Sequence, residues 1–375
     1  MAIMVFNDGE LIIKFCFIII RMLDQGDECR LKVGIPRGLL FYRFYAYWTT
    51  FLKELGAELV ISPPTNKLII QRGLTYGVDE ICFPVKVFLG HCHYLKDKVD
   101  SLFVPRMVSF CKNEYNCPKI LGLPDMVRNL FNIPQERIID DEINMRDRGF
   151  IGWRQGFIEI GKRFTSNNKK INYALQVAEE AHFQYRKKIA NGYFPENLVD
   201  NHPMLTSYQE KILLLGHSYL INDSYINMNI LQKMNTMGYS IVTSDMIDEK
   251  KIRKALKKIP KPSFWTISNE VLGSALYSIY QKDPAIKGFV HLVSFECGPD
   301  SLVGELIERW LRREVHSIPY LRLEIDEHTG EAGLITRLEA FVDMMKWRTE
   351  TFESNLSSSC SSECGSGGSL SSTGH

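Results

Sequence analysis

The chain has 375 residues, of which 45% are hydrophobic and 24% are charged, and its formal net charge is +1. A chain of this length is typical of two domains. A charge balance this close to neutral produces no strong field of either sign, so we expect neither nucleic acid nor an acidic membrane surface as a partner. The chain has nine cysteines, an odd number, and no clear secretion signal. We therefore expect no disulfide framework and a location in a reducing compartment, the cytoplasm.

The N-terminal residues 1–30 are predicted to be an extension outside the folded core. Their apolar stretch, 11–23, is too short to span a bilayer, and Lys14 and Arg21 interrupt or flank it. No small-residue cleavage site follows, so the stretch makes a poor signal peptide. Met22 could be the true start of the chain, with the preceding residues an upstream extension.

Residues 31–150 are predicted to form a first α/β domain, because short apolar runs alternate there with helical patterns. Thr65 or Asn66 is expected to cap the second helix, and Pro84 suits the first turn of the third. The predicted strands are 31–35, 57–62 and 99–105, and a short run lies near 137–143. The predicted helices are 39–56, 65–80, 84–98 and 123–132, and a polar loop is predicted over 106–122.

One or two long helices over 152–190 are expected to form a helical connection, residues 151–208, to a second α/β domain over 209–350. The predicted strands there are 211–217, 239–244, 263–268, 288–295 and 318–326. The predicted helices are 224–238, 248–259, 269–282, 301–314 and 333–348. Strands that alternate with helices predict parallel sheets flanked by helices, so we predict two Rossmann-like domains with a cleft between them.

The tail, residues 351–375, is predicted to be disordered. Ser and Gly supply 14 of the 22 residues from Ser354 onward, and such a composition cannot build a core. Cys360 and Cys364 lie in this tail at CxxxC spacing and could bind a metal or take part in redox chemistry. The simpler interpretation is a dispensable tail.

Three cysteines share one local setting, a connection from strand to helix. Cys82 lies two residues before a proline, Cys117 lies directly before one, and Cys297 lies directly before a Gly-Pro pair. In an open α/β sheet, ligands bind at the carboxyl ends of the strands, and a helix N-terminus stabilises a thiolate. The three thiolates could therefore converge on one cleft between the domains.

Two interpretations of these cysteines remain open. Four thiolates usually hold a cubane iron–sulfur cluster, so three would leave one iron open to substrate, water or a bridging sulfide. A structural zinc ion usually takes four ligands, commonly from CxxC pairs, and no CxxC occurs in the chain. The spacing of the cysteines matches no general motif, so from the pattern alone three packed or loop residues without a ligand are the simpler interpretation.

Two histidines are a weaker candidate for a metal site. His91 and His93 flank Cys92 on a predicted helix, where alternate positions face different sides, so a packed or exposed pair is the simpler interpretation. The chain has no GxxxxGK(S/T) motif and no GxGxxG motif after a strand. ATP or dinucleotide binding through the usual phosphate loops is therefore not expected.

A polar cluster follows the last predicted strand. Its carboxylates and histidine could do acid–base work. They could equally form a polar turn in which Thr329 caps the last helix. The cluster consists of Asp326, Glu327, His328 and Glu331.

Three stretches of the chain together resemble a known family. The first begins VGIPRGLLFYRFYAYW, the second joins VDEICFPVKVFLGH to NEYNCPKILGLPD, and the third joins ECGPDSLVGELIERW to IPYLRLEIDEHTGEAG. They resemble the acyl-CoA dehydratase activase-related family, also described as the uncharacterised CoA enzyme activase domain. That family is similar to the cluster-bearing subunits of 2-hydroxyacyl-CoA dehydratases, benzoyl-CoA reductases and double-cubane cluster proteins. The resemblance covers about Lys32 to Lys346.

The resemblance implies that three cysteines hold an iron–sulfur cluster in the cleft. The cluster would be a single 4Fe–4S cluster or a linked double cubane. Cys82 in EICFP, Cys117 in NCPK and Cys297 in ECGPD match the expected ligand positions. The residues expected close behind the ligands are Lys86, Glu114, Lys119 and Glu296.

The resemblance also implies a separate ATP-hydrolysing activase as electron donor. Because this chain lacks a recognisable nucleotide motif, it resembles the electron-accepting side. We therefore expect an oxygen-sensitive iron–sulfur protein of anaerobic metabolism that acts in the reductive dehydration or reduction of an acyl-CoA. The alternatives are a non-catalytic electron-transfer or cluster-scaffold protein and a metal-free α/β binding module. The sequence leaves open whether the chain is itself an enzyme, a lyase or reductase component, and whether it forms a homodimer.

Overall fold

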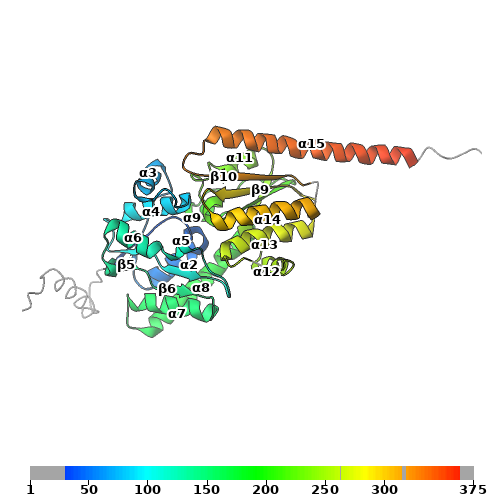
Figure 1. Ribbon diagram of the computed structural model, residues 1–375. Coiled ribbons are helices and arrows are strands. Elements are labelled where there is room, and N and C mark those ends of the chain that lie inside the picture. Colours follow the sequence, from blue (N-terminus) through cyan, green and yellow to red (C-terminus); the bar gives the residue numbers. More distant parts are fainter. Residues whose placement is uncertain (1–29, 262, 315–317, 364–375) are drawn as a thin grey trace, which may run out of the picture.

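The computed structural model describes residues 30–261, 263–314 and 318–363, and the predicted N-terminal extension lies almost wholly outside these ranges. Two four-stranded sheets, one in each half of the chain, are flanked by helices (Figure 1). All the strand pairs in both sheets are parallel. The predicted fold class, α/β with two Rossmann-like halves, is therefore confirmed.

The first sheet has the strand order β2-β1-β3-β5. Helices α3 and α4 pack against each other, α2 packs against α8, and the two pairs lie at opposite sides of this half (Figure 1). Asn66 caps α3 by accepting from the N–H groups of Leu68 and Ile69, as one of the two predicted caps. The elements are β1 Lys32–Ile35, α2 Phe41–Glu54, β2 Glu58–Ile61, α3 Lys67–Tyr76, α4 Phe83–Leu95, β3 Ser101–Phe103, α6 Leu123–Phe131, β5 Ile138–Ile139, α7 Phe150–Lys162 and α8 Asn168–Ala190.

The second sheet has the strand order β10-β9-β7-β8. Side chains along β7 alternate between its two faces, as the period of a strand requires. Ile212 and Leu214 pack in the core that includes α15, whereas Leu213 and Leu215 pack against α12, α13 and α14. Figure 1 shows α11 and α15 above this sheet and the other three helices below it. The elements are β7 Lys211–Gly216, α11 Ile230–Thr236, β8 Ser240–Thr243, α12 Glu249–Leu256, α13 Thr266–Gln281, β9 Ile286–Ser294, α14 Gly298–Glu314, β10 Tyr320–Ile325 and α15 Glu331–Glu363.

The predicted polar loop over 106–122 is wrong at both ends. Residues Arg106–Ser109 form the strand β4, which pairs in parallel with β6, Glu142–Asn144. Residues Pro118–Leu121 form the short helix α5. The strand escaped prediction because it has only four residues and begins at a charged side chain directly after a proline. A 3-10 turn, Gln135–Arg137, precedes β5.

Two predictions for the second half are also corrected. Of the predicted strand 263–268, residues 266–268 are instead the start of α13, and only Trp265 makes a β-bridge there, to Tyr115. The predicted helix 224–238 shrinks to α11, because Met228 and Asn229 take left-handed backbone conformations with φ of 55° and 57°. A left-handed residue cannot continue a right-handed helix. Three further short elements were not predicted: α9 Pro195–Asp200, α10 Ser218–Ile221 and the 3-10 turn Ser244–Met246.

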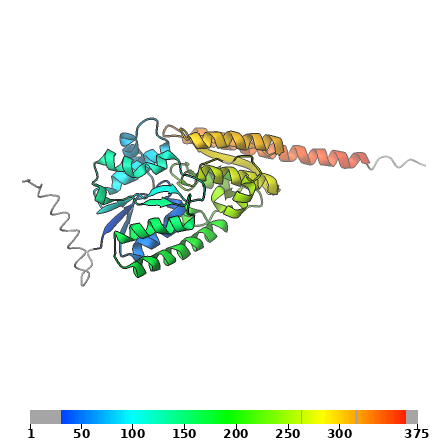
Figure 2. The same ribbon diagram turned by 60° about the horizontal axis from the view of Figure 1, so that its bottom comes forward.

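Helix α8 connects the two halves. Its Tyr185 hydroxyl donates to the carbonyl of Tyr42 at 2.6 Å, and its Arg186 donates to the carbonyl of Asp245 at 3.0 Å. Figure 2 shows the green helices α7 and α8 side by side along one side of the molecule. Arg37, two residues after the end of β1, also pairs with Asp200 of α9 at 2.7 Å. Helix α8 thus makes polar contacts with both halves of the chain.

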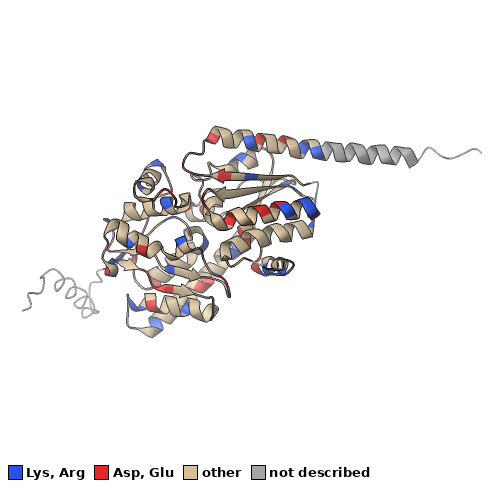
Figure 3. Ribbon diagram, in the orientation of Figure 1, with Lys and Arg blue, Asp and Glu red and all other residues tan. Residues whose placement is uncertain are grey.

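Helix α15 projects beyond the second sheet and runs to Glu363, into the segment predicted to be disordered (Figure 1). Residues 364–375, with Cys364, lie outside the described ranges, as does the side chain of Cys360. Lys and Arg are interspersed with Asp and Glu over both halves (Figure 3). Within the described ranges, no helix combines the length and the apolar composition that crossing a membrane requires.

Candidate metal centre

Each of the three predicted cysteine ligands directly precedes the first residue of a helix. Cys82 precedes α4, Cys117 precedes α5 and Cys297 precedes α14. Each helix has a proline at its first or second position, where the missing N–H is harmless and the fixed φ suits the helix. The predicted local setting is therefore present three times. Helix α14 begins at Gly298, two or three residues earlier than the expected start at Asp300 or Ser301.

The three cysteines line one pocket of about 420 Å³. Cys82 and Cys117 come from the first half of the chain and Cys297 from the second, so the pocket lies between the halves. The other lining residues are mainly aromatic and aliphatic, with a few polar groups: Tyr115, Pro118, Lys119, Ile120, His217, Tyr219, Trp265, Thr266, Ile267, Ser268, Glu296, Gly298, Pro299 and Leu302.

The three sulfur atoms are spread too widely for one metal ion. Among the described residues, Cys82 and Cys117 do not belong to any group of three ligand atoms within 4.8 Å of one another. Two thiolates on a single zinc ion lie at most about 4.6 Å apart, because each Zn–S bond is about 2.3 Å long.

Burial raises the pKa of all three thiols, Cys82, Cys117 and Cys297. The amide N–H three residues further along the chain lowers the pKa in each case, and the charge of Lys119 lowers it for the first two. These opposing groups do not cancel the effect of burial. Without a cation the thiols are protonated at neutral pH, whereas a bound metal deprotonates a coordinating thiol. The three amides belong to Val85, Ile120 and Asp300.

Lys119 and Glu296, two of the four residues expected behind the ligands, line the pocket. The ammonium group of Lys119 donates to the carbonyls of Glu80 at 3.1 Å and of Glu296 at 3.3 Å. Glu296 has a φ of 64°, and a side chain in this left-handed region costs about 1 kcal/mol. Strain of this kind is common where a loop positions a functional group.

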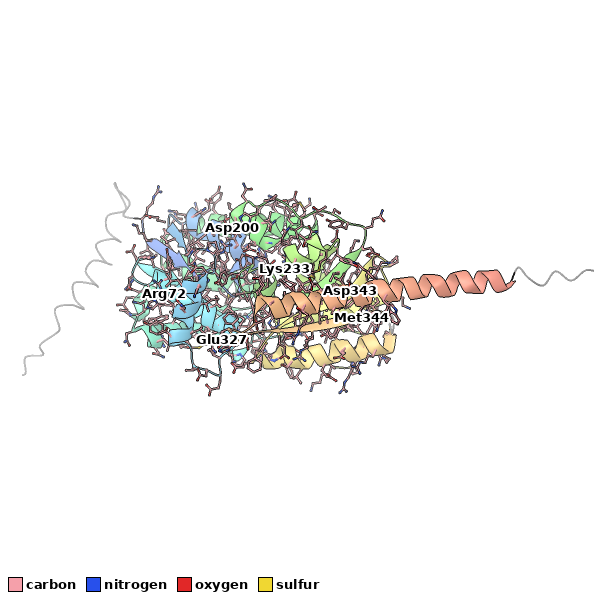
Figure 4. All side chains as sticks on the ribbon, turned by 90° about the horizontal axis from the view of Figure 1, so that it is seen from above. Arg72, Asp200, Lys233, Glu327, Asp343 and Met344 are labelled. Atoms are coloured by element: carbon pink, nitrogen blue, oxygen red, sulfur yellow. The ribbon has the colours of Figure 1, made fainter. Side chains whose placement is uncertain are left out.

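Lys86 and Glu114, the other two, do not line the pocket. Lys86 is buried and pairs with Glu327 at 2.6 Å, and Figure 4 shows Glu327 at the boundary between the first half and α15. Glu114 pairs with Arg253 and accepts from the amide of Asn269 at 2.7 Å. Both therefore hold the two halves together around the pocket.

The sequence reasoning missed His217, which lines the pocket beside the cysteines. Its Nδ1 is 2.5 Å from the hydroxyl of Tyr219, and its Nε2 is 3.7 Å from Asp300. Burial lowers the pKa of His217, and the nearby Asp300 only partly opposes this. Burial would raise the pKa of Asp300, but His217 and His291 outweigh it and hold that pKa below its usual value. A signal existed, because His217 ends the predicted strand 211–217 and so lies at a carboxyl edge.

The remaining histidine candidates are packed, as the simpler interpretation predicted. His91 is fully buried and its Nε2 is 3.1 Å from the hydroxyl of Thr65. His93 stacks on Tyr76 with ring centroids 4.7 Å apart. Cys92 between them is fully buried in the core, which is the ordinary role of a free cysteine.

The polar cluster after β10 forms a turn. Asp326 accepts from the backbone N–H of His328 at 2.9 Å and from the hydroxyl of Thr329 at 2.7 Å. Thr329 therefore bonds within the turn, and α15 begins two residues later at Glu331. Within the described structure this arrangement favours the polar-turn interpretation over acid–base chemistry.

Comparison with known proteins identifies one family. The model of the CoA enzyme activase uncharacterised domain matches residues 32–247, more than half of the chain. This range contains Cys82, Cys117 and His217 and ends before Cys297. A search of curated proteins returned no match.

Proposed function

The chain belongs to the family of the CoA enzyme activase uncharacterised domain, and from this premise we propose that it is an iron–sulfur protein of a reducing acyl-CoA system. In this proposal it accepts low-potential electrons from an ATP-dependent activase. The cluster is a 4Fe–4S cluster, or alternatively a linked double cubane, held by Cys82, Cys117 and Cys297. The relation to the cluster-bearing subunits of acyl-CoA dehydratases and reductases is part of this proposal.

The observation that carries the proposal is the convergence of the three cysteines. They come from segments separated by 35 and 180 residues, yet they line one pocket. A chance arrangement of packing cysteines would not place all three at helix starts that face the same space. Cys92, by comparison, is buried in the core and does not line the pocket.

The residues present fit an iron–sulfur cluster better than a single ion. The three sulfur atoms do not all lie within 4.8 Å of one another, a spacing wider than that of two thiolates on one zinc ion, and three thiols in a partly apolar pocket are a favourable ligand set for iron–sulfur clusters. When bound, such a cluster supplies one-electron transfer at a potential set by its ligands, its net charge and the hydrogen bonds to its sulfurs.

The protein groups around the pocket have assignable roles. Lys119 places a positive charge beside Cys82 and Cys117, where it favours the thiolates. The backbone amides of Val85, Ile120 and Asp300, in the first turns of α4, α5 and α14, lower the pKa of the three thiols and so also favour the thiolates. Trp265 and Leu302 present apolar surface to the pocket, which suits an acyl chain and keeps water away from the thiolates.

The test is electron transfer to the anaerobically prepared protein. We expect a brown protein whose visible absorption bleaches when a matching activase, a reductant and ATP are added together. Omission of ATP is the matched control and should leave the absorption unchanged. A protein that stays colourless after anaerobic reconstitution with iron and sulfide would refute the proposal, as would bleaching that needs no ATP.

The alternative functions differ in the step after reduction. A catalytic component turns over an acyl-CoA once it is reduced, whereas an electron-transfer or scaffold protein passes electrons or the cluster to another protein without turnover. A metal-free binding module carries no iron. Multiple-turnover assays with 2-hydroxyacyl-CoA and enoyl-CoA substrates therefore separate the first two, and iron content separates both from the third.

A further inference from the structure

A second, narrower set of ligand atoms lies beside the pocket: two of its residues, His217 and Cys297, line the pocket, whereas the third, Asp300, does not. One ring nitrogen of His217, the sulfur of Cys297 and a carboxylate oxygen of Asp300 all lie within 4.8 Å of one another. His217 directly follows β7, and Cys297 follows β9, the neighbouring strand. The parallel pairing of these strands brings their carboxyl ends to the same edge of the sheet, which explains why the residues meet.

Two buried polar atoms in this set have no hydrogen-bond partner. His217 is 4% exposed and Asp300 is fully buried. Among the described residues, neither Nε2 of His217 nor Oδ2 of Asp300 has a hydrogen-bond partner. The gap of 3.7 Å between Nε2 and Oδ1 of Asp300 is too long for a hydrogen bond. Buried polar groups left in this state are unfavourable, so a third group is expected to bind both.

Both side chains are held in place by outer contacts. Nδ1 of His217 is 2.5 Å from the hydroxyl of Tyr219. Asp300 Oδ1 is 3.3 Å from Nε2 of His291, whose Nδ1 is in turn 2.9 Å from the hydroxyl of Tyr320. Metal-binding histidines and carboxylates are oriented by partners of this kind.

We propose that His217, Cys297 and Asp300 bind a single divalent transition-metal ion, of the zinc class, in protein that carries no cluster. Nitrogen, thiolate and carboxylate ligands together suit zinc. Neighbouring nitrogen and oxygen ligands of a tetrahedral zinc ion lie about 3.4 Å apart, close to the 3.7 Å between Nε2 of His217 and Oδ1 of Asp300, the oxygen that also lies 3.3 Å from His291. Three protein ligands leave a fourth position for water or another ligand, as in catalytic zinc sites.

This site goes beyond the proposed function, because it needs neither Cys82 nor Cys117. It shares only Cys297 with the proposed cluster ligands. The two ligand sets can therefore be separated by mutation: the cluster requires all three cysteines, whereas the single ion requires His217, Cys297 and Asp300.

The experiment is a titration of the metal-free, thiol-reduced full chain with Co²⁺ under argon. We expect thiolate-to-cobalt charge-transfer absorption that saturates at about one equivalent and disappears when Zn²⁺ is added. His217→Gln and Cys297→Ser should each weaken Co²⁺ binding at least about tenfold. Cys82→Ser and Cys117→Ser are the matched controls and should leave the affinity within about twofold of the unaltered chain.

Thermal unfolding of each variant shows whether it is folded. If His217→Gln does not fold, the difference in Co²⁺ affinity between Cys297→Ser and Cys82→Ser still tests the inference. Binding without thiolate charge transfer would overturn the inference. Equal loss of the absorption in all three cysteine variants would overturn it too. Neither result bears on the iron–sulfur proposal. Cobalt binding at the triad, in a protein that forms no cluster on reconstitution, would refute the iron–sulfur proposal and leave the single-ion site supported.

Discussion

The ammonium group of Lys119 donates to the backbone carbonyl of Glu296 at 3.3 Å and so joins the loop of Cys117 to the loop of Cys297. The same group donates to the carbonyl of Glu80 at 3.1 Å, two residues before Cys82. One side chain therefore connects all three cysteine-bearing segments and places a positive charge among the thiols.

Replacing Lys119 by Met should weaken the metal centre without unfolding the protein. The variant removes both hydrogen bonds and the charge that lowers the pKa of Cys82 and Cys117. Changes to groups that support metal ligands typically reduce affinity 10–100-fold, so we expect iron loss to a chelator to accelerate by about tenfold. Lys119→Arg retains the charge and is the control. Equal rates for Met and Arg would show that the charge has no part in retention.

Serine at Cys82, Cys117 or Cys297 should remove most of the iron from anaerobically reconstituted protein, because each change leaves two thiolate ligands for the cluster. Alanine at Cys111, which lies outside the pocket, should leave the iron content unchanged. Iron and acid-labile sulfide assays on all four variants make the comparison. Normal iron in any one serine variant would remove that cysteine from the ligand set.

Gly90→Ala should destabilise the helix pair that carries Cys82. A Cβ at position 90 would lie 2.0 Å from the carbonyl oxygen of Ile69, so α3 and α4 would have to separate. Overpacking of this kind costs about 1–3 kcal/mol. Chemical denaturation measures the free energy of unfolding.

Gly333→Ala is the matched control for this change. A Cβ there meets no atom within 4 Å, and the position lies in the first turn of α15. Alanine should therefore leave the stability unchanged or raise it by up to about 1 kcal/mol. If both alanine variants unfolded at the same denaturant concentration, the close packing of α3 on α4 would be contradicted.

His91 should make the protein sensitive to acid. Burial, with the nearby Arg37, lowers the pKa of His91 to about 3, whereas an unfolded histidine has a pKa of about 6.5. Below about pH 6.5 the unfolded state binds a proton that the folded state does not, so the free energy of unfolding falls until the pH approaches 3. At pH 4.5 the loss from this residue is about 2–3 kcal/mol.

His91→Gln can keep a hydrogen bond to Thr65 but cannot titrate, so it should remove this part of the pH dependence. Urea unfolding at pH 7 and pH 4.5 gives the change for the variant and the unaltered chain. On going from pH 7 to pH 4.5, we expect the free energy of unfolding of the variant to rise by about 2–3 kcal/mol relative to that of the unaltered chain. Gln at the exposed His202 is the control. If the difference in free energy of unfolding between the variant and the unaltered chain were the same at both pH values, the role of His91 in the acid sensitivity would be contradicted.

Sequence periodicity was enough to predict the alternation of strands and helices, because both sheets are parallel and their strands form clear apolar runs. Periodicity failed to predict the elements whose bounds depend on local backbone geometry. The strand β4 is hidden behind Pro105, and the left-handed Met228 and Asn229 interrupt an otherwise regular helical pattern. Neither effect has a strong signature in residue type.

The cysteine setting was predicted at each position separately, since a proline next to a cysteine after an apolar run is visible in the sequence. That the three positions face one pocket depends on how the two halves pack, and this rests on contacts such as Lys86 with Glu327 across 241 residues. His217 was missed because it belongs to no motif, although the strand-end argument used for Cys297 applies to it equally.

The central claim is that Cys82, Cys117 and Cys297 hold an iron–sulfur cluster, and its most direct test is iron and acid-labile sulfide analysis of anaerobically purified and reconstituted protein. The account predicts about four iron and four sulfide per chain for a single cubane, or about twice that for a linked pair, with brown colour that air bleaches. Less than one iron per chain with no labile sulfide, in protein shown to be folded, would contradict it.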